Sequence, residues 1–167
     1  MRKTIQALSF MLLAGSTANS FAADAPLTYN IKRLSLETAT RIAQATITAC
    51  RKEGVQVAVT VVDRGGHPQV VMRDVLAMDI TLPISKKKAH TAMSFNTDLT
   101  QLVDQFKTNP HGAASIPEIV VSGGGIPINI GGNILGGIGV SGAPSALTDE
   151  KCAKAGLAAV QDDLELE

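Results

Sequence analysis

The stretch from Gly123 to Gly142 reads GGGIPINIGGNILGGIGVSG, and nearly half of its positions are glycine. An ordinary core segment would be weakened by so many glycines, because each one costs backbone entropy and offers no side chain to bury. Apolar residues between the glycines predict two short strands, over 126–130 and 133–141, whose backbone something approaches closely. A packed helix, a partner subunit and a flat ligand are the three candidates for that approach.

The second of these strands has one face that is nearly bare. That face is formed by Leu135, Gly137, Gly139 and Ser141. The opposite face is formed by Ile134, Gly136, Ile138 and Val140. Glycine in a strand marks a close approach to the backbone, and we expect a helix rather than a ligand to make it.

The rest of the chain predicts a mixed fold. Apolar residues at helical spacing predict helices over 36–53, 82–95, 98–107 and from Thr148 onward. Apolar runs bounded by turn residues predict strands over 57–62, 69–73 and 116–122. The expected order is α-β-β-α-α-β-β-β-α. Hairpin connections make the five-stranded sheet mainly antiparallel, so the class is α+β, with helices flanking the sheet.

The N-terminus has the features of a secretory signal peptide. A basic start, an apolar run over residues 5–14 and a small-x-small site ending at Ala22 follow one another. We therefore expect residues 1–22 to be cleaved, and residues 23–167 to form a single domain in the periplasm or outside the cell. No later segment is long and apolar enough to predict a membrane span.

Charge and cysteine content narrow the class of protein further. The chain has 15 basic and 15 acidic side chains, so its charge predicts neither nucleic acid nor an anionic membrane as a partner. Its two cysteines, Cys50 and Cys152, fall on predicted helices. A disulfide between them and a pair of buried thiols are equally consistent with the sequence.

The helix predicted over 82–95 carries a histidine beside two lysines. His90 follows Lys86 by four positions and Lys87 by three, so the three side chains share one side of the helix. An imidazole flanked by two ammonium groups suits a ligand with a metal centre and anionic arms, because imidazole is a common metal and haem ligand. A solvated basic face is the alternative interpretation.

A second glycine pattern resembles a dinucleotide-binding motif but lacks the elements that must follow it. Residues 137–142 match the dinucleotide-binding sequence G-x-G-x-x-G. That motif requires a helix and then a second strand with an acidic residue, whereas a single predicted helix completes this chain. We therefore expect no dinucleotide site at these glycines.

Several segments together resemble the GlcG/HbpS-type haem-binding family, in the order seen in that family. They are Cys50-Arg51, Val57–Gly66, Arg73-Asp74, Lys87–Ala89 with Thr91-Ala92, Gly123–Gly142, and Asp149-Glu150 with Ala153–Gly156. His90 departs from the family pattern, in which this position often carries an aromatic residue. The most specific piece is Gly-Gly-x-Pro-Ile followed by Gly-Gly-Ile-Gly-Val-Ser-Gly. The resemblance covers almost all of residues 23–167. It implies a profilin-like or GlcG-like domain, a homo-oligomer, and haem or a related tetrapyrrole as ligand; some members are described as haem-degrading.

The helix face, the bare glycine face of the last predicted strand and the resemblance together predict an exported haem-binding protein that scavenges, buffers or presents haem, with haem degradation left open. The glycine face and the helix with His90 would together form the seat for the haem. The residues expected to bind haem are His90, Lys86, Lys87, Arg73 and Thr91. His90 is the expected ligand of the haem iron, and His67 and His111 are the other histidines available for that position. The basic side chains would meet the propionates.

Two further hypotheses stay open at this stage. The first is an enzyme that acts on a small metabolite in a cleft near Asp74, Lys88 and Thr91, with haem adventitious. The second is an interaction module whose glycine faces serve subunit packing alone. No recognised catalytic spacing supports the enzyme, and the sequence assigns it no catalytic residues.

Overall fold

The computed structural model describes residues 25–108 and 112–167. The predicted signal peptide and His111 lie outside these described residues. Residues 31–167 form one unit, and residues 25–30 contain neither helix nor strand. Within the described ranges, no helix combines the length and the apolar character needed to cross a membrane.

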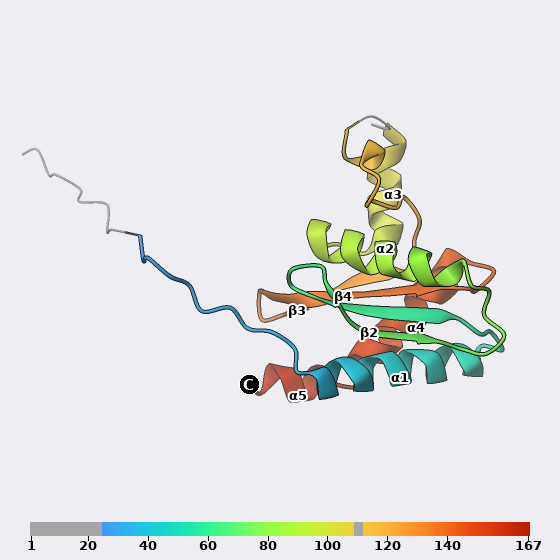
Figure 1. The fold of residues 1–167 in the computed structure, drawn as a ribbon, viewed down its shortest axis with the longest axis horizontal. Coiled ribbons are helices and arrows are strands. Elements are labelled where there is room, and N and C mark those ends of the chain that lie inside the picture. The colour runs from blue at the N-terminus through green and yellow to red at the C-terminus, as the bar shows by residue number, and fades with distance from the viewer. Residues whose placement is uncertain (1–24, 109–111) are drawn as a thin grey trace, which may run out of the picture. The chain divides into compact units, whose positions relative to one another are not determined.

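A four-stranded antiparallel sheet lies at the centre of residues 31–167, in the order β2-β1-β4-β3 (Figure 1). The strands are β1 (Ala58–Asp63), β2 (Pro68–Arg73), β3 (Gly125–Ile130) and β4 (Asn133–Ser141). Two hairpins, β1-β2 and β3-β4, are joined by the pairing of β1 with β4. The predicted α+β class and antiparallel sheet are confirmed.

The predicted fifth strand is wrong. Residues 116–122 form a loop after a short 3₁₀ turn, η1 (Ala113–Ser115). Pro117 has no N–H to give to a ladder, and the N–H of Val120 donates to Thr91 Oγ1 at 3.1 Å. Val120 also packs with apolar residues of two helices, α2 (Thr81–Phe95) and α3 (Leu99–Thr108). Its apolar character therefore serves helix packing and not the sheet.

In the described part of the chain, five α-helices lie around the sheet. Besides α2 and α3 they are α1 (Leu36–Lys52), α4 (Ala146–Ala158) and α5 (Gln161–Glu165). α1 and α4 lie together on one face of the sheet, and α2 covers the other (Figure 1). The sequence predicts Thr148 as the cap of the last helix, whereas Ser145 caps α4: its hydroxyl accepts from the N–H of Leu147 at 3.2 Å, and the helix begins at Ala146.

A disulfide between Cys50 and Cys152 joins α1 to α4, with their Cα atoms 5.4 Å apart. Both cysteines are buried within the larger apolar core, which fills the space between the sheet and these two helices. The sequence is consistent with a disulfide and with two thiols, and the structure selects the disulfide.

The bare face of β4 is covered by α2. A Cβ on Gly137 would lie 2.5 Å from the carbonyl oxygen of Ala89, and one on Gly139 would overlap the carbonyl oxygen of Ser85. The helix backbone therefore rests directly on the strand, which only glycine permits at these two positions. The predicted helix packing is confirmed, and this face is not available to a ligand.

The alternation predicted for β4 is wrong at its start, because the strand contains a β-bulge. Asn129 of β3 pairs with Ile134, whereas Ile128 pairs with Gly136, which leaves Leu135 as an extra residue. One extra residue reverses which face every earlier side chain occupies. Leu135 consequently packs in the core beside α1 and α4, and Ile134 packs on the α2 side.

Candidate functional site

An open cavity of about 380 Å³ lies along the outer face of α2. It is lined by Pro83, Lys86, Lys87 and His90 of the helix and by Pro117 and Glu118 of the loop that precedes β3. The four helical positions recur at the spacing that places side chains on one side of a helix. The structure therefore brings together the three residues of this helix face that the sequence singled out, Lys86, Lys87 and His90.

His90 is half-buried and lies against the turn between β1 and β2. A Cβ built on Gly66 of that turn would overlap Nδ1 of the imidazole and lie 2.9 Å from its Cε1. Gly66 adopts a φ of +80°, which favours glycine. The turn thus supports one edge of the imidazole, and Nε2 is the ring nitrogen farther from this contact.

We expect Gly66→Ala to lower the free energy of unfolding by about 3 kcal/mol, since it adds a left-handed backbone cost to a steric clash with His90. Gly132→Ala is the matched control, because Gly132 has a φ of +81° and no described atom lies within 4 Å of a Cβ built there. It should cost only about 1 kcal/mol. Urea unfolding measures both, and equal losses would contradict the contact between His90 and the turn.

The loop wall of the cavity is held to α2 by two polar contacts. The Nζ of Lys87 donates to the carbonyl oxygen of Pro117 at 2.8 Å. Thr91 is buried, and its hydroxyl donates to the carbonyl oxygen of Lys87 at 2.7 Å while it accepts from Val120. Thr91 therefore positions the wall and does not line the cavity. Two ammonium groups and the single carboxylate of Glu118 leave the lining positively charged.

Arg73 does not join this group. Its guanidinium pairs with Asp79 at 3.3 Å and donates to the carbonyl oxygen of Ala77. Arg73 instead borders a different cavity, of about 520 Å³, between α1 and β2. His67 lies in the turn beside Gly66, 82% exposed and 3.5 Å from Asp63, and it does not line the α2 cavity.

The residues predicted for an enzymatic cleft are not brought together. Asp74 accepts two hydrogen bonds from the Arg51 guanidinium, at 2.7 and 2.8 Å, and these lower the pKa of its carboxyl below the ordinary value. Lys88 is buried elsewhere, 3.0 Å from Asp149 and 2.9 Å from the carbonyl oxygen of Val140. Both side chains are satisfied by structural partners, and Thr91 serves the loop, so the cleft expected from these three residues does not form.

Burial raises the pKa of the Asp149 carboxyl above its ordinary value, against the opposing effects of the Lys88 ammonium and the N–H of Ala143. Lys88 and Asp149 thus form a buried ion pair beneath α2. Removal of one partner from such a pair strongly destabilises a protein, because it leaves a buried charge without a partner. We assign it a structural role, in joining α2 to the start of α4.

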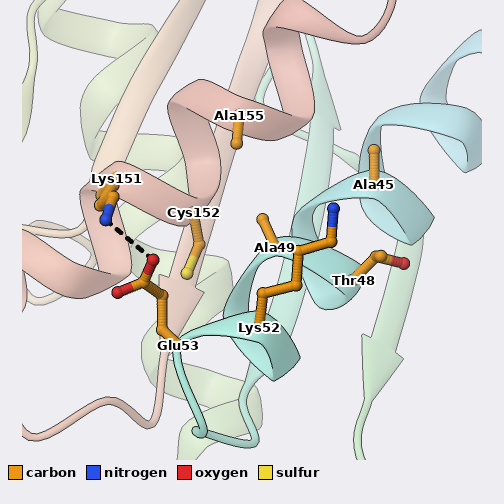
Figure 2. A pocket seen from close by; sticks show the side chains of 8 residues that line it. All are labelled: Ala45, Thr48, Ala49, Lys52, Glu53, Lys151, Cys152 and Ala155. Carbon is orange, nitrogen blue, oxygen red and sulfur yellow. Dashed lines mark hydrogen bonds and ion pairs between the residues drawn. The ribbon is translucent and has the colours of Figure 1, made fainter.

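A further cavity, of about 430 Å³, lies between α1 and α4 (Figure 2). Figure 2 shows that its walls carry mostly small side chains, with Cys152 of the disulfide beside them and the Lys151–Glu53 ion pair, at 2.8 Å, at its edge. The charged pair satisfies itself, and Lys52 and Thr48 supply the polar groups of the remaining walls. The cavity is the space that small side chains leave between two closely packed helices.

Sequence reasoning missed Pro83, Pro117 and Glu118 as parts of the α2 cavity. Pro83 could have been found from its helical spacing to Lys87 and His90. Pro117 and Glu118 could not, because a strand over 116–122 would have belonged to the sheet and not to the outer face of α2.

Comparisons with known proteins agree with this architecture. A family model described as haem-degrading protein HbpS-like matches residues 34–158. A double mutant of HbpS from Streptomyces reticuli is 36% identical, and its crystal structure matches with a TM-score of 0.76 over 82% of this chain and 93% of that one. A crystal structure of a PduOC–haem complex is 28% identical, with a TM-score of 0.69 over 77% of this chain and 95% of that one.

A curated protein is also similar. It is described as an uncharacterised 15.0 kDa protein in the dhaT–dhaS intergenic region of Citrobacter freundii. It is 30% identical over 116 residues, which make up 67% of this chain and 82% of that protein.

Proposed function

The chain belongs to the HbpS-like haem-degrading family, and on this premise we propose that it binds haem or a related tetrapyrrole along the outer face of α2. The observation that carries the proposal is the shared cavity of His90, Lys86 and Lys87. A relative with 28% identity was solved as a haem complex, which supports the same class of ligand.

The cavity residues fit such a ligand in kind. His90 would hold the iron through Nε2, because its other ring nitrogen faces Gly66. Lys86 and Lys87 would meet the propionates, and the rings of Pro83 and Pro117 would contact the macrocycle. When bound, haem supplies a redox-active iron; the chain's own part is to orient it and to neutralise its carboxylates. Among the described residues no Phe, Tyr or Trp lines the cavity, so we expect moderate affinity, suited to buffering or presenting haem.

The proposal also includes where the protein binds haem and in which oligomeric state. We infer that the protein is exported, which the predicted signal peptide and the disulfide both support, since disulfides persist in oxidising compartments. Degradation of haem is proposed only as an additional activity, because the matching family model carries that description. We further propose that the protein works as a homo-oligomer.

Titration of the purified protein with haemin, followed by absorption spectroscopy, tests the ligand. We expect a shifted Soret band for the wild type and at least a tenfold weaker affinity for His90→Ala, which corresponds to about 1.4 kcal/mol. His67→Ala is the matched control, because His67 is exposed in the neighbouring turn and outside the cavity. Unchanged bands and affinity in His90→Ala would remove His90 from this role.

A further inference from the structure

The loop that joins β2 to α2 presents four large apolar side chains to solvent. Val75, Leu76, Met78 and Ile80 are 79%, 77%, 66% and 58% exposed, whereas Ala77 between them is 5% exposed. A single exposed apolar residue needs no explanation, but a cluster of them marks a surface that something covers. We call residues 75–80 the apolar loop.

The backbone of the apolar loop is held in place by hydrogen bonds. The N–H of Leu76 donates to Oε1 of Gln56 at 2.8 Å, and the N–H of Ala77 donates to the carbonyl oxygen of Asp74 at 3.0 Å. Arg73 donates to the carbonyl oxygen of Ala77. Buried Ala77 and these bonds anchor the loop, so its large side chains cannot turn inward without breaking them. The apolar surface is preorganised, which lowers the entropy cost of binding a partner.

The charges around the apolar loop cancel locally. Asp79 is the only charged residue in its sequence, and it lies 3.3 Å from the guanidinium of Arg73. Two copies of this surface could therefore face each other without the repulsion that like charges would cause. The loop also follows β2, which stands at an edge of the sheet, so a second copy can approach it past the last strand.

The apolar area is sufficient for a specific contact between two copies. At their exposed fractions, the four residues expose on the order of 500 Å² in one copy, and two copies would bury up to about 1,000 Å² if all of it were covered, near the lower limit for a specific interface. We propose that the apolar loop is the surface through which this chain binds a second copy of itself. This inference rests on the homo-oligomer of the proposed function and names the surface that forms it.

The test compares the mass of the full mature chain, by light scattering and sedimentation velocity, with that of Leu76→Asp/Met78→Asp. We expect the wild type to assemble and the variant to lose at least half of that mass, because buried carboxylates would oppose the contact. Leu147→Asp is the matched control, since Leu147 is 69% exposed on α4, outside the loop; its mass should stay unchanged. Circular dichroism checks folding, and Leu76→Ser/Met78→Ser replaces the first variant if that one fails to fold.

Each outcome separates the two proposals. An assembled wild type whose loop variant keeps its full mass would overturn the loop as the interface but leave the homo-oligomer standing. A wild type that remains monomeric at all concentrations would overturn both, and binding of the loop to lipid vesicles without self-association would do the same. Haemin titration of the monomeric variant reports on haem binding independently of assembly.

Discussion

Gly139→Ala is expected to lower the free energy of unfolding by at least about 4 kcal/mol. A Cβ at this position would overlap the carbonyl oxygen of Ser85 and the amide nitrogen of Ala89, both of them backbone atoms of α2. Neither can move without displacing the helix from the sheet. Overpacking of a core costs about 1–3 kcal/mol, occasionally more, and displacement of α2 would also disturb buried polar contacts that are worth about 1–3 kcal/mol each.

Two of those contacts are the hydrogen bond between Thr60 and Ser85, at 2.8 Å, and the Lys88–Asp149 pair. Urea unfolding followed by circular dichroism measures the loss. Gly131→Ala is the control, because Gly131 is in the β3–β4 turn with a φ of +56°, and a Cβ added there would meet no described atom within 4 Å. It should cost about 1 kcal/mol. A loss at Gly139 no larger than at Gly131 would show that α2 does not rest on the strand backbone.

Removal of the disulfide should have the second large effect. Cys50 and Cys152 are separated by 102 positions in the sequence, and the chain-entropy treatment gives about 4.7 kcal/mol for a loop of about that length. We expect Cys50→Ala/Cys152→Ala to lower the free energy of unfolding by about 4 kcal/mol. Because the cross-link constrains mainly the unfolded chain, reduction of the wild type by dithiothreitol should shift the urea midpoint by a similar amount.

The neighbouring ion pair supplies the control for this prediction. Lys151→Ala breaks the contact between Lys151 and Glu53, which also joins α1 to α4 but lies at the surface. Exposed pairs contribute up to about 1 kcal/mol, so this variant should unfold close to the wild-type midpoint. If the double cysteine variant were as stable as Lys151→Ala, the disulfide would not constrain the unfolded chain as proposed.

The elements that the sequence predicts correctly are those whose signals are local. The glycines of β4 predict a helix packed on the strand, and the close contact of Gly137 and Gly139 with the backbone of α2 confirms it. The bulge at Leu135 is not predictable from alternation, because an extra residue leaves the pattern of apolar letters intact while it reverses the faces. Residues 116–122 are apolar enough for a strand, but their partners are Thr91 and the helices, which only the tertiary structure reveals.

In the candidate site, too, local sequence spacing is predictable and tertiary contacts are not. Helical spacing alone groups Lys86, Lys87 and His90, and the structure places them around one cavity. Arg73 cannot be assigned in this way, since its distance from His90 depends on the path of β2 and the loop after it. The pairing of Arg73 with Asp79 is likewise invisible in the sequence, because Arg73 ends β2 and the loop from there to Asp79 has no regular geometry.

The two sides of α2 differ in how they can change during evolution. Its inward side meets the backbone of β4, so Gly137 and Gly139 leave no room for a side chain beneath the helix. Its outward side carries Lys86, Lys87 and His90 at the surface cavity, on the opposite side of the helix from these two glycines. Descendants of such a chain can acquire a new ligand through a few outward replacements while the architecture is inherited unchanged.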